Sequence, residues 1–321
     1  MNKIEFGDCR ETMRRWAGHG VRAQTCVTSP PYFGLRDYGH DGQLGLEQTP
    51  EEYVAAMVEL FRCVRDVLAD DGTLWLNIGD SYASAGGQSA QAGQMADRAH
   101  GKAARSARFS GDGIKNKELI GIPWMLAFAL RADGWYLWQD IIWSKPNPMP
   151  ESVRDRCTKA HEYLFLLSKS ERYYYDAEAV MEPVAASTVE RLGQPTLHQQ
   201  EGSARVPGKT NGNMKAVGRP DKRNRRSVWT IATRPDKGAH FATFPPALIE
   251  PCILAGSRPG DIVLDPFMGS GTTAAVALQH GRQYLGCELN REYGPLQQER
   301  IAKAVPANDN LPKTGDLFAS G

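Results

Sequence analysis

Residues 261–288 read DIVLDPFMGSGTTAAVALQHGRQYLGCE. The apolar run at 261–264 predicts a buried strand, the glycines after it predict a turn, and residues 272–280 predict a helix. A second apolar run at 283–287 predicts another strand. Because a strand, a helix and a strand in this order form a right-handed unit, the sequence predicts a parallel sheet within an α/β fold.

The turn between the first strand and the helix suits a ligand that contains a nucleoside. Gly269 and Gly271 allow the backbone to approach a ligand closely, and the N–H groups at the start of the helix are free to bind it. Glu288 ends the next strand, about 20 residues further on, where a carboxylate can accept hydrogen bonds from both ribose hydroxyls. These features predict a site for an adenosine.

Two other nucleotide sites fit the turn less well. A turn that binds NAD has a third glycine in the pattern G-x-G-x-x-G, and Ala274 stands at that position. A phosphate-binding P-loop has a lysine before its serine or threonine, and no lysine precedes Ser270 or Thr272. An oxidoreductase that binds a dinucleotide is therefore a rival with less support, and the expected ligand is an adenosine without a pyrophosphate.

A second loop, Ser29-Pro30-Pro31-Tyr32, follows an apolar segment at 23–28 that predicts another buried strand. Prolines fix φ and lack an N–H, so carbonyl oxygens of this loop can be held as acceptors toward a ligand. An exocyclic amine has two N–H groups and needs two acceptors. Binding both draws the nitrogen toward a tetrahedral geometry, whose lone pair can attack a methyl group in line. The Tyr32 ring adds a face on which an extruded base could stack.

The two loops together resemble those of the DNA amino-methyltransferases, which carry a (D/S/N)PP(Y/F/W) catalytic loop and a DPFxGSGTT cofactor loop. In the β class of this family the catalytic loop comes first, the target-recognition region follows, and the cofactor loop lies near the C-terminus. This chain has the same order, and the resemblance covers most of residues 1–300. It implies a Rossmann-like S-adenosylmethionine-dependent methyltransferase fold, with a doubly wound, mixed seven-stranded sheet and a target-recognition insert. The cofactor and the flipped base would meet at the carboxyl ends of neighbouring strands.

The same resemblance implies roles for particular residues. Ser29 and the carbonyl group of Pro30 would hold the target amine, Pro31 completes the catalytic loop, and Tyr32 would stack on the flipped base. The expected cofactor-binding residues are Asp8, Cys9, Phe241, Phe244, Pro245, Asp265, Pro266, Phe267, Gly269, Ser270, Gly271, Thr272, Thr273 and Glu288. A plain turn aspartate is an equal alternative for Asp8, and core packing is an alternative for the two phenylalanines at 241 and 244.

Composition and motif order together divide the chain into four parts. Residues 1–180 are expected to form the catalytic half of the methyltransferase domain, with a mobile loop at about 82–117 that has almost no large aliphatic residues. Residues 181–240 are expected to form the target-recognition region, and 241–305 the cofactor-binding half. Residues 306–321 are expected to be a flexible tail.

Local patterns predict the other elements of the fold. Thr49-Pro50-Glu51-Glu52 combines an N-cap, a proline at the first helical position and a capping-box glutamate, which predicts a helix that ends at Asp71-Gly72. Further helices are expected over 122–130 and 246–255, and further strands over 73–78, 135–143 and 163–167.

The net charge of the chain is only +1, so a surface for nucleic acid must come from local clusters of basic residues. The richest cluster lies in the target-recognition region, where acids are scarce. We expect DNA contacts from Arg205, Lys209, Lys215, Arg219, Arg223, Arg225 and Arg226. The loop at 82–117 carries a second cluster, which fits a solvated linker as well as a loop that faces DNA.

The six cysteines are scattered without a CxxC pair, and no group of His and Cys has the spacing of metal ligands. The first residues lack an apolar signal segment, and no apolar run is long enough to span a membrane. The sequence therefore indicates a reduced, metal-free cytoplasmic protein whose partner is double-stranded DNA. A monomer and a homodimer are both open.

Within the family, serine at position 29 favours cytosine N4 as the target, because aspartate is commoner there in enzymes that methylate adenine N6. A hydroxyl and a carboxylate both accept hydrogen bonds, so adenine N6 is the alternative. Methylation of a ring carbon would need a nucleophilic cysteine, and Cys252 lies instead on the apolar stripe of a predicted helix. The expected function is methyl transfer to cytosine N4 in duplex DNA by base flipping. RNA as the substrate and a non-catalytic nucleic-acid-binding protein on the same scaffold are the remaining rivals.

Overall fold

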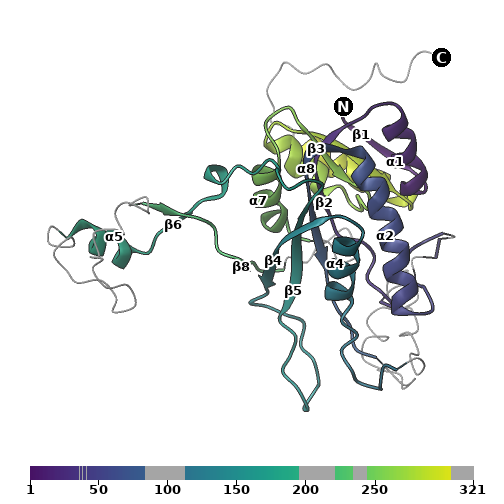
Figure 1. The fold of residues 1–321 in the computed structure, drawn as a ribbon, viewed down its shortest axis with the longest axis horizontal. Helices are drawn as coiled ribbons and strands as arrows, with labels where there is room; N and C mark the ends of the chain where they lie inside the picture. The colour runs from purple at the N-terminus through teal and green to yellow at the C-terminus, as the bar shows by residue number, and fades with distance from the viewer. Residues whose placement is uncertain are drawn as a thin grey trace.

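The computed structural model of the chain describes residues 1–35, 37, 39–40, 42–83, 113–194, 221–233 and 244–304. Within these residues a mixed sheet has helices on both faces (Figure 1). Its strand order is β1-β10-β9-β2-β3-β5-β4-β8. The predicted α/β fold with a doubly wound mixed sheet is confirmed. The described part of the sheet has eight strands rather than seven, and the short strand β8 forms one edge.

The elements have the following bounds. The sheet contains β1 (Lys3–Phe6), β2 (Ala23–Thr28), β3 (Leu68–Ile78), β4 (Tyr136–Ser144), β5 (His161–Ser168), β8 (Val228–Thr230), β9 (Ile262–Asp265) and β10 (Gln283–Glu288). The helices are α1 (Cys9–Gly18), α2 (Pro50–Val67), α4 (Ile122–Ala132), α5 (Ala186–Gly193), α7 (Pro246–Gly256), α8 (Thr272–Gln279) and α9 (Gly294–Ala304), with short 3₁₀ turns at Glu178–Val180 and Arg291–Tyr293. A separate pair of short strands is β6 (Glu182–Pro183) with β7 (Lys222–Arg223).

Five adjacent strands, from β1 to β3 in the strand order, are parallel, whereas β5 is antiparallel to both of its neighbours. Alternate side chains of these strands enter two cores, as the two-residue period of a strand requires. On one face Cys26, Leu76 and Leu264 pack with α1, α2 and α4. On the other face Val27, Trp75 and Val263 pack with α7 and α8. Figure 1 shows these helix groups on opposite sides of the sheet.

The start of α2 follows the sequence prediction, but its end does not. Thr49 Oγ1 accepts a hydrogen bond from the N–H of Glu52 at 3.1 Å, and the Glu52 carboxylate accepts one from the N–H of Thr49 at 3.3 Å. The helix ends at Val67, and Leu68 already belongs to β3. Leu68 is buried in the same core as the helix stripe, so the apolar pattern continues across the boundary and does not mark it.

Within the predicted target-recognition region, β6, α5 and β7 project from the body as an arm (Figure 1), whereas β8 joins the main sheet beside β4. The two predicted halves of the methyltransferase domain, residues 1–180 and 241–305, both contribute strands to the same sheet. The exact domain boundaries stay a prediction. Among the described helices, none combines the length and the apolar character that crossing a membrane requires.

Candidate active site

The catalytic loop 29–32 and the glycine turn 265–271 lie at the carboxyl ends of two adjacent strands. Because β2 is parallel to its neighbour β9, both strands end on the same side of the sheet, and the two segments begin there. The hydroxyl of Thr28 donates a hydrogen bond to Oδ1 of Asp265 over 2.6 Å, although these residues are 237 positions apart in the chain. The fold therefore makes neighbours of two motifs from opposite ends of the sequence.

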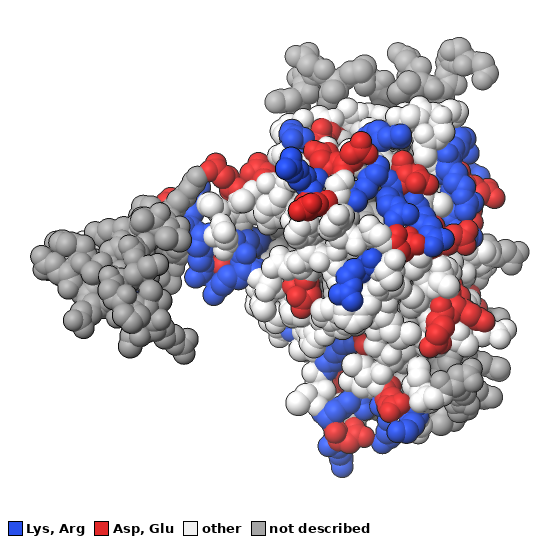
Figure 2. All heavy atoms as spheres, viewed as in Figure 1, with Lys and Arg blue, Asp and Glu red and all other residues white. Residues whose placement is uncertain are grey.

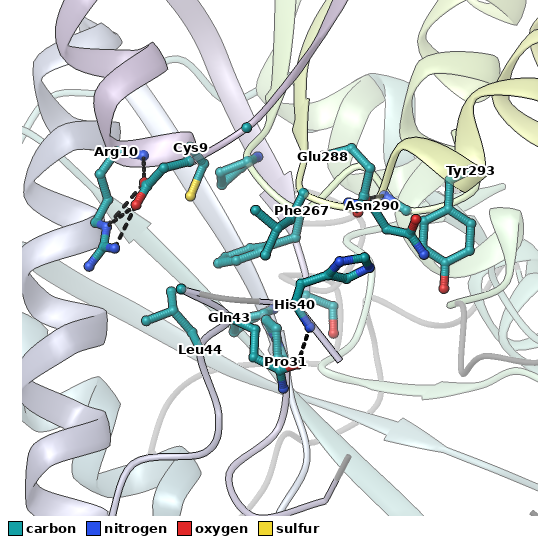
Figure 3. Close-up of a pocket in the computed structure, with 18 of the residues that line it drawn as sticks. Cys9, Arg10, Pro31, His40, Gln43, Leu44, Phe267, Glu288, Asn290 and Tyr293 are labelled. Atoms are coloured by element: carbon teal, nitrogen blue, oxygen red, sulfur yellow. Dashed lines mark hydrogen bonds and ion pairs between the residues drawn. The ribbon is translucent and has the colours of Figure 1, made fainter. Parts of the chain in front are cut away.

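A cavity opens between the two loops (Figure 3). Eight of the predicted residues on these loops line it: Ser29, Pro30, Pro31, Tyr32, Pro266, Phe267, Gly269 and Ser270. Asp8, Cys9 and Glu288 line it as well, from the loop after β1 and from the end of β10. The catalytic loop and the glycine turn thus face one shared space.

Asp265 holds the glycine turn from behind the cavity. Its side chain is 1% exposed, and the residue is not part of the lining. Its Oδ1 accepts hydrogen bonds from the Thr28 hydroxyl and, at 3.0 Å, from the N–H of Phe267. Its Oδ2 accepts one from the Thr273 hydroxyl at 2.6 Å. Burial raises the pKa of Asp265 to about 6. The hydrogen bonds lower the pKa, but burial has the larger effect. Asp265 can therefore act on a ligand only through the shape of the turn.

Glu288 has the position that a ribose-binding carboxylate requires. Its Oε2 accepts a hydrogen bond from the N–H of Gly269 at 2.7 Å, and its Oε1 accepts one from the N–H of Asn290 at 2.8 Å. Each oxygen keeps a further lone pair for a ligand. Burial raises the pKa of Glu288, and the backbone hydrogen bonds oppose that change. Gly269 adopts a φ of 52°, in the left-handed region that favours glycine.

Asp8 is a capping residue that also lies in the wall of the cavity, and its contact with the cofactor stays a prediction. It is the N-cap of α1, and its Oδ1 accepts a hydrogen bond from the N–H of Arg10 at 2.7 Å. The Arg10 guanidinium also pairs with Oδ2 at 2.6 Å, as the dashed lines in Figure 3 show, and this hydrogen bonding lowers the pKa of Asp8. Asp8 is therefore a helix cap that also lines the cavity.

The catalytic loop is held by side chains from other elements. The hydroxyl of Tyr53 on α2 donates a hydrogen bond to the carbonyl oxygen of Pro31 at 2.8 Å. The hydroxyl of Tyr32 donates to Oε2 of Glu162 on β5 at 2.7 Å, and it lies 3.3 Å from Oδ1 of Asn77 on β3. Burial raises the pKa of Tyr32 well above its ordinary value, so the phenol remains a neutral donor.

Sequence reasoning missed part of the cavity wall. The residues in question are Gly7, Arg10, Leu35, His40, Gly42, Gln43, Leu44, Leu289, Asn290 and Tyr293. Asn290 and Tyr293 follow Glu288 closely, so proximity along the chain could have found them. His40, whose side chain points toward Asn290 in Figure 3, belongs to a segment without a motif. That segment reaches the cavity only through the fold.

Several predicted cofactor residues lie outside the lining of the cavity. Besides Asp265, these are, within the described residues, Phe244, Pro245, Gly271, Thr272 and Thr273. Phe244 packs against the core with α7, and Pro245 is the buried residue that precedes this helix. Core packing, the alternative for Phe244, is thus what the structure shows. The other three residues form the start of α8, and Phe241 lies outside the described residues.

The basic residues predicted to contact DNA differ in their surroundings. Arg223 and Arg226 both pair with Oε1 of Glu182, at 2.9 and 2.8 Å, and so brace the root of the arm. The Arg225 guanidinium lies 4.5 Å from the ring centroid of Trp229, and its Nε has no hydrogen-bond partner within the described part of the chain. Figure 2 shows basic side chains gathered where the arm meets the body. The predicted residues Arg205, Lys209, Lys215 and Arg219 lie outside the described residues.

Cys252 has the surroundings of a structural cysteine. It is fully buried within α7, and its Sγ lies 3.4 Å from the carbonyl oxygen of Leu248, one turn earlier in the helix. Burial raises the pKa of Cys252, so the thiolate that attack on a base carbon requires is disfavoured. The structure therefore agrees with the exclusion of carbon methylation through this residue.

The fold and the cavity define the class of the chain. A mixed sheet covered on both faces, with a cavity where β2 and β9 end, is the architecture of Rossmann-like methyltransferases. Two solved structures share this fold. The PvuII DNA methyltransferase, described as cytosine-N4-specific, matches with a TM-score of 0.60 at 19% identity, over 94% of this chain and 86% of that chain. A protein of Thermus thermophilus described as a DNA modification methylase, solved with S-adenosyl-L-methionine, matches with a TM-score of 0.58 at 22% identity, over 96% of each chain.

Sequence comparison identifies the family. The model of a family described as DNA methylase matches residues 23–299. The Type II methyltransferase M.SmaI of Serratia marcescens is 49% identical over 302 residues, which cover 94% of this chain and 91% of that protein. The chain therefore belongs to the DNA methylase family and is a DNA methyltransferase. The resemblance to the DNA amino-methyltransferases that its two loops carry is confirmed.

Proposed function

We propose that this enzyme transfers the methyl group of S-adenosylmethionine directly to the exocyclic N4 of a cytosine that is flipped out of duplex DNA. The observation that carries the proposal is the shared cavity, which the catalytic loop 29–32 and the glycine turn 265–271 face from adjacent strands. A methyl donor held by the turn and an amine held by the loop would meet within it. Such positioning can supply a large share of the rate enhancement.

The donor set of the cavity fits S-adenosylmethionine. Each carboxylate oxygen of Glu288 is bonded to one backbone N–H and retains a lone pair for a ribose hydroxyl. The ring of Phe267, which lines the cavity, offers an apolar face for the adenine. Asp8 also lines the cavity and would accept a hydrogen bond from the adenine amine. The bound cofactor supplies an activated methyl group, and the protein supplies its orientation.

The catalytic loop has two acceptors for the two N–H groups of the target amine. The carbonyl of Pro31 already accepts the hydroxyl of Tyr53. The side chain of Ser29 and the carbonyl of Pro30 are therefore the groups that would bind the amine, and both line the cavity. This pair of acceptors would turn the nitrogen lone pair toward the methyl group. The ring of Tyr32 would stack on the flipped base.

The nature of residue 29 supports cytosine as the target base. A serine hydroxyl is a weaker acceptor than an aspartate carboxylate, and the resemblance associates serine with cytosine N4. Adenine N6 is the alternative target, because the same two acceptors could bind its amine. The arm and residues 181–240 would read the DNA sequence, with Arg225 as a phosphate or base contact at its root.

The decisive experiment identifies the methylated nucleoside. Unmethylated plasmid DNA is incubated with the enzyme and S-adenosylmethionine, digested to nucleosides and analysed by mass spectrometry. We expect 4-methylcytosine. The appearance of 6-methyladenine would show that adenine N6 is the target. The appearance of 5-methylcytosine would overturn direct transfer to an amine. A parallel incubation with RNA of the same sequence tests the remaining substrate, and methylated RNA alone would exclude duplex DNA.

A further inference from the structure

Behind the catalytic loop, polar side chains of β3 and β5 contact the hydroxyl of Tyr32, and a lysine just after β4 contacts one of them. Glu162 on β5 accepts the hydrogen bond of the Tyr32 hydroxyl through Oε2 at 2.7 Å. The Nδ2 of Asn77 on β3 donates to the same oxygen at 3.3 Å and to the carbonyl of Tyr163 at 3.1 Å. Lys145, the residue after β4, forms an ion pair with the other oxygen of Glu162. The phenol thus ends in a charged cluster that the sheet holds in place.

The charged pair in this cluster is sheltered from solvent. The side chains of Glu162 and Lys145 are only 16% and 18% exposed. The Lys145 ammonium also lies 4.3 Å from the ring centroid of Trp143, which restricts it further. A hydrogen bond to a sheltered carboxylate is stronger than one between neutral groups. Glu162 is therefore a firm anchor for the Tyr32 hydroxyl.

The ring of Tyr32 is fixed along its length as well as at its end. A Cβ at Gly79 would lie 2.5 Å from Cε2 of this ring, so the backbone of residue 79 packs directly against it. The hydroxyl end is fixed by Glu162 and Asn77. Because a tyrosine side chain has only two rotatable bonds, these contacts set the plane of the ring.

The carboxylate also decides the direction of the hydrogen bond at the end of the ring. An ionised glutamate has no proton to donate, so the Tyr32 hydroxyl must give its proton to Glu162. The loop residue Tyr32 is therefore tied to β5 through a bond that only the phenol can donate.

We propose that Glu162 is a positioning residue for methyl transfer, which anchors the Tyr32 hydroxyl and so fixes the ring on which the flipped base would stack. Lys145 supports this role by holding the second oxygen of the carboxylate. The inference rests on the proposed transfer to an amine in the cavity. It assigns a function in that reaction to a residue outside the cavity lining.

A double-mutant cycle tests the inference with unmethylated plasmid DNA and S-adenosylmethionine that carries a tritiated methyl group. Glu162→Gln retains the shape of the side chain but removes its charge, so the hydrogen bond from Tyr32 is weakened and the ion pair with Lys145 is lost. We expect it to lower kcat about tenfold and to change the KM for S-adenosylmethionine less than about twofold. In the Tyr32→Phe background the same substitution should lower kcat less than about twofold, because the phenol through which Glu162 acts is absent.

Three further measurements make each result decisive. Glu59→Gln removes the exposed ion pair with Arg14, neither residue of which lines the cavity, and should leave kcat unchanged. Should Glu162→Gln not fold, Glu162→Asp keeps the charge that pairs with Lys145, shortens the side chain by one methylene, and enters the same cycle. An equal loss in both backgrounds, or no loss in either, overturns the positioning role. Wild-type enzyme that methylates no DNA in this assay would instead overturn the function on which the inference rests.

Discussion

The glycine turn and the catalytic loop face one cavity but are held in place by different means. In the turn 265–271, Asp265 and the start of α8 are joined by hydrogen bonds within a few residues. The catalytic loop 29–32 depends on Tyr53 of α2 and on Glu162 of β5. The cofactor motif therefore supplies part of its own scaffold and takes the rest from Thr28, Glu288 and Gln297, whereas the catalytic motif depends on side chains of other elements.

The largest expected effect comes from removing the centre of the turn. Asp265→Ala leaves the Thr28 and Thr273 hydroxyls and the Phe267 N–H without their acceptor in a buried place. We expect a loss of about 4 kcal/mol in the free energy of unfolding and no measurable binding of S-adenosylmethionine. Chemical denaturation and calorimetry measure the two quantities. Normal cofactor binding by this variant would show that the turn does not depend on its aspartate.

The same residue predicts a dependence of stability on pH. The pKa of Asp265 rises from 3.8 to about 6 on burial, so the folded protein holds this proton more tightly than the unfolded chain. The stabilising contribution of this carboxyl is therefore complete below about pH 4 and is lost as the pH rises through about 6. Relative to Asp265→Asn, the wild type should lose about 3 kcal/mol of unfolding free energy between about pH 3 and about pH 7. A constant difference between the two proteins across this range would contradict the raised pKa.

The next effect concerns the catalytic loop alone. Ser29→Ala removes one of the two proposed acceptors for the amine. The glycine turn 265–271 and Glu288, which are proposed to bind the cofactor, are left unchanged. We expect turnover to fall more than about tenfold, with little change in the affinity for S-adenosylmethionine. Methyl transfer assays and calorimetry on the same preparation separate the two. Equal turnover in the variant and the wild type would refute the role of Ser29.

A smaller effect should follow from crowding the Tyr32 ring. In Gly79→Ala the new methyl group would lie 2.5 Å from the ring, which must then move. We expect kcat to fall about fivefold while cofactor affinity is retained, because only the catalytic side of the cavity is disturbed. Gly18→Ala is the matched control, since no atom lies within 4 Å of the added methyl group. Equal kcat values for both variants would show that the ring tolerates displacement.

The smallest effect is expected at the arm, which belongs to neither loop. Arg225→Gln should weaken DNA binding about threefold and reduce the slope of log K against log salt by about 1, as the loss of one phosphate contact predicts. Arg14→Gln, far from the arm, is the control. Arg223→Gln should also loosen the root of the arm, because Arg223 pairs with Glu182. An unchanged salt slope in Arg225→Gln would remove this residue from the DNA interface.

Sequence patterns predicted the parts of the fold whose signals are local. The apolar run at 23–28 coincides with β2, and the capping box at Thr49 marks the start of α2. The first strand and helix were not predicted, because KIEF is short and half polar, and the buried Met13 and Trp16 stand among charged residues. Helix α9 was missed for a similar reason, since its sequence GPLQQERIAKA is mostly polar.

The residues of the site also differ in whether a local sequence signal marks them. Glu288 could be found because it stands at a fixed distance along the chain from the glycine turn. Glu162 and His40 could not, because each reaches the site through strand pairing or loop folding between segments that share no motif. Phe244 was assigned to the cofactor through the resemblance, with core packing as the alternative; it packs against the core in the structure, and its cofactor contact stays a prediction. Neighbours in a motif can be predicted from sequence, whereas neighbours across a sheet require the fold.

The pairing of β1 with β10 joins the start of the described chain to its last strand, with Phe6 opposite Glu288. A circularly permuted chain could join its last residue to its first through a linker and begin instead in the arm, between α5 and β7. Every strand would keep its present neighbours. The rearranged polypeptide would carry the glycine turn before the catalytic loop. The sheet therefore allows either linear arrangement of the two motifs, and chain order by itself is a record of ancestry rather than a requirement of the chemistry.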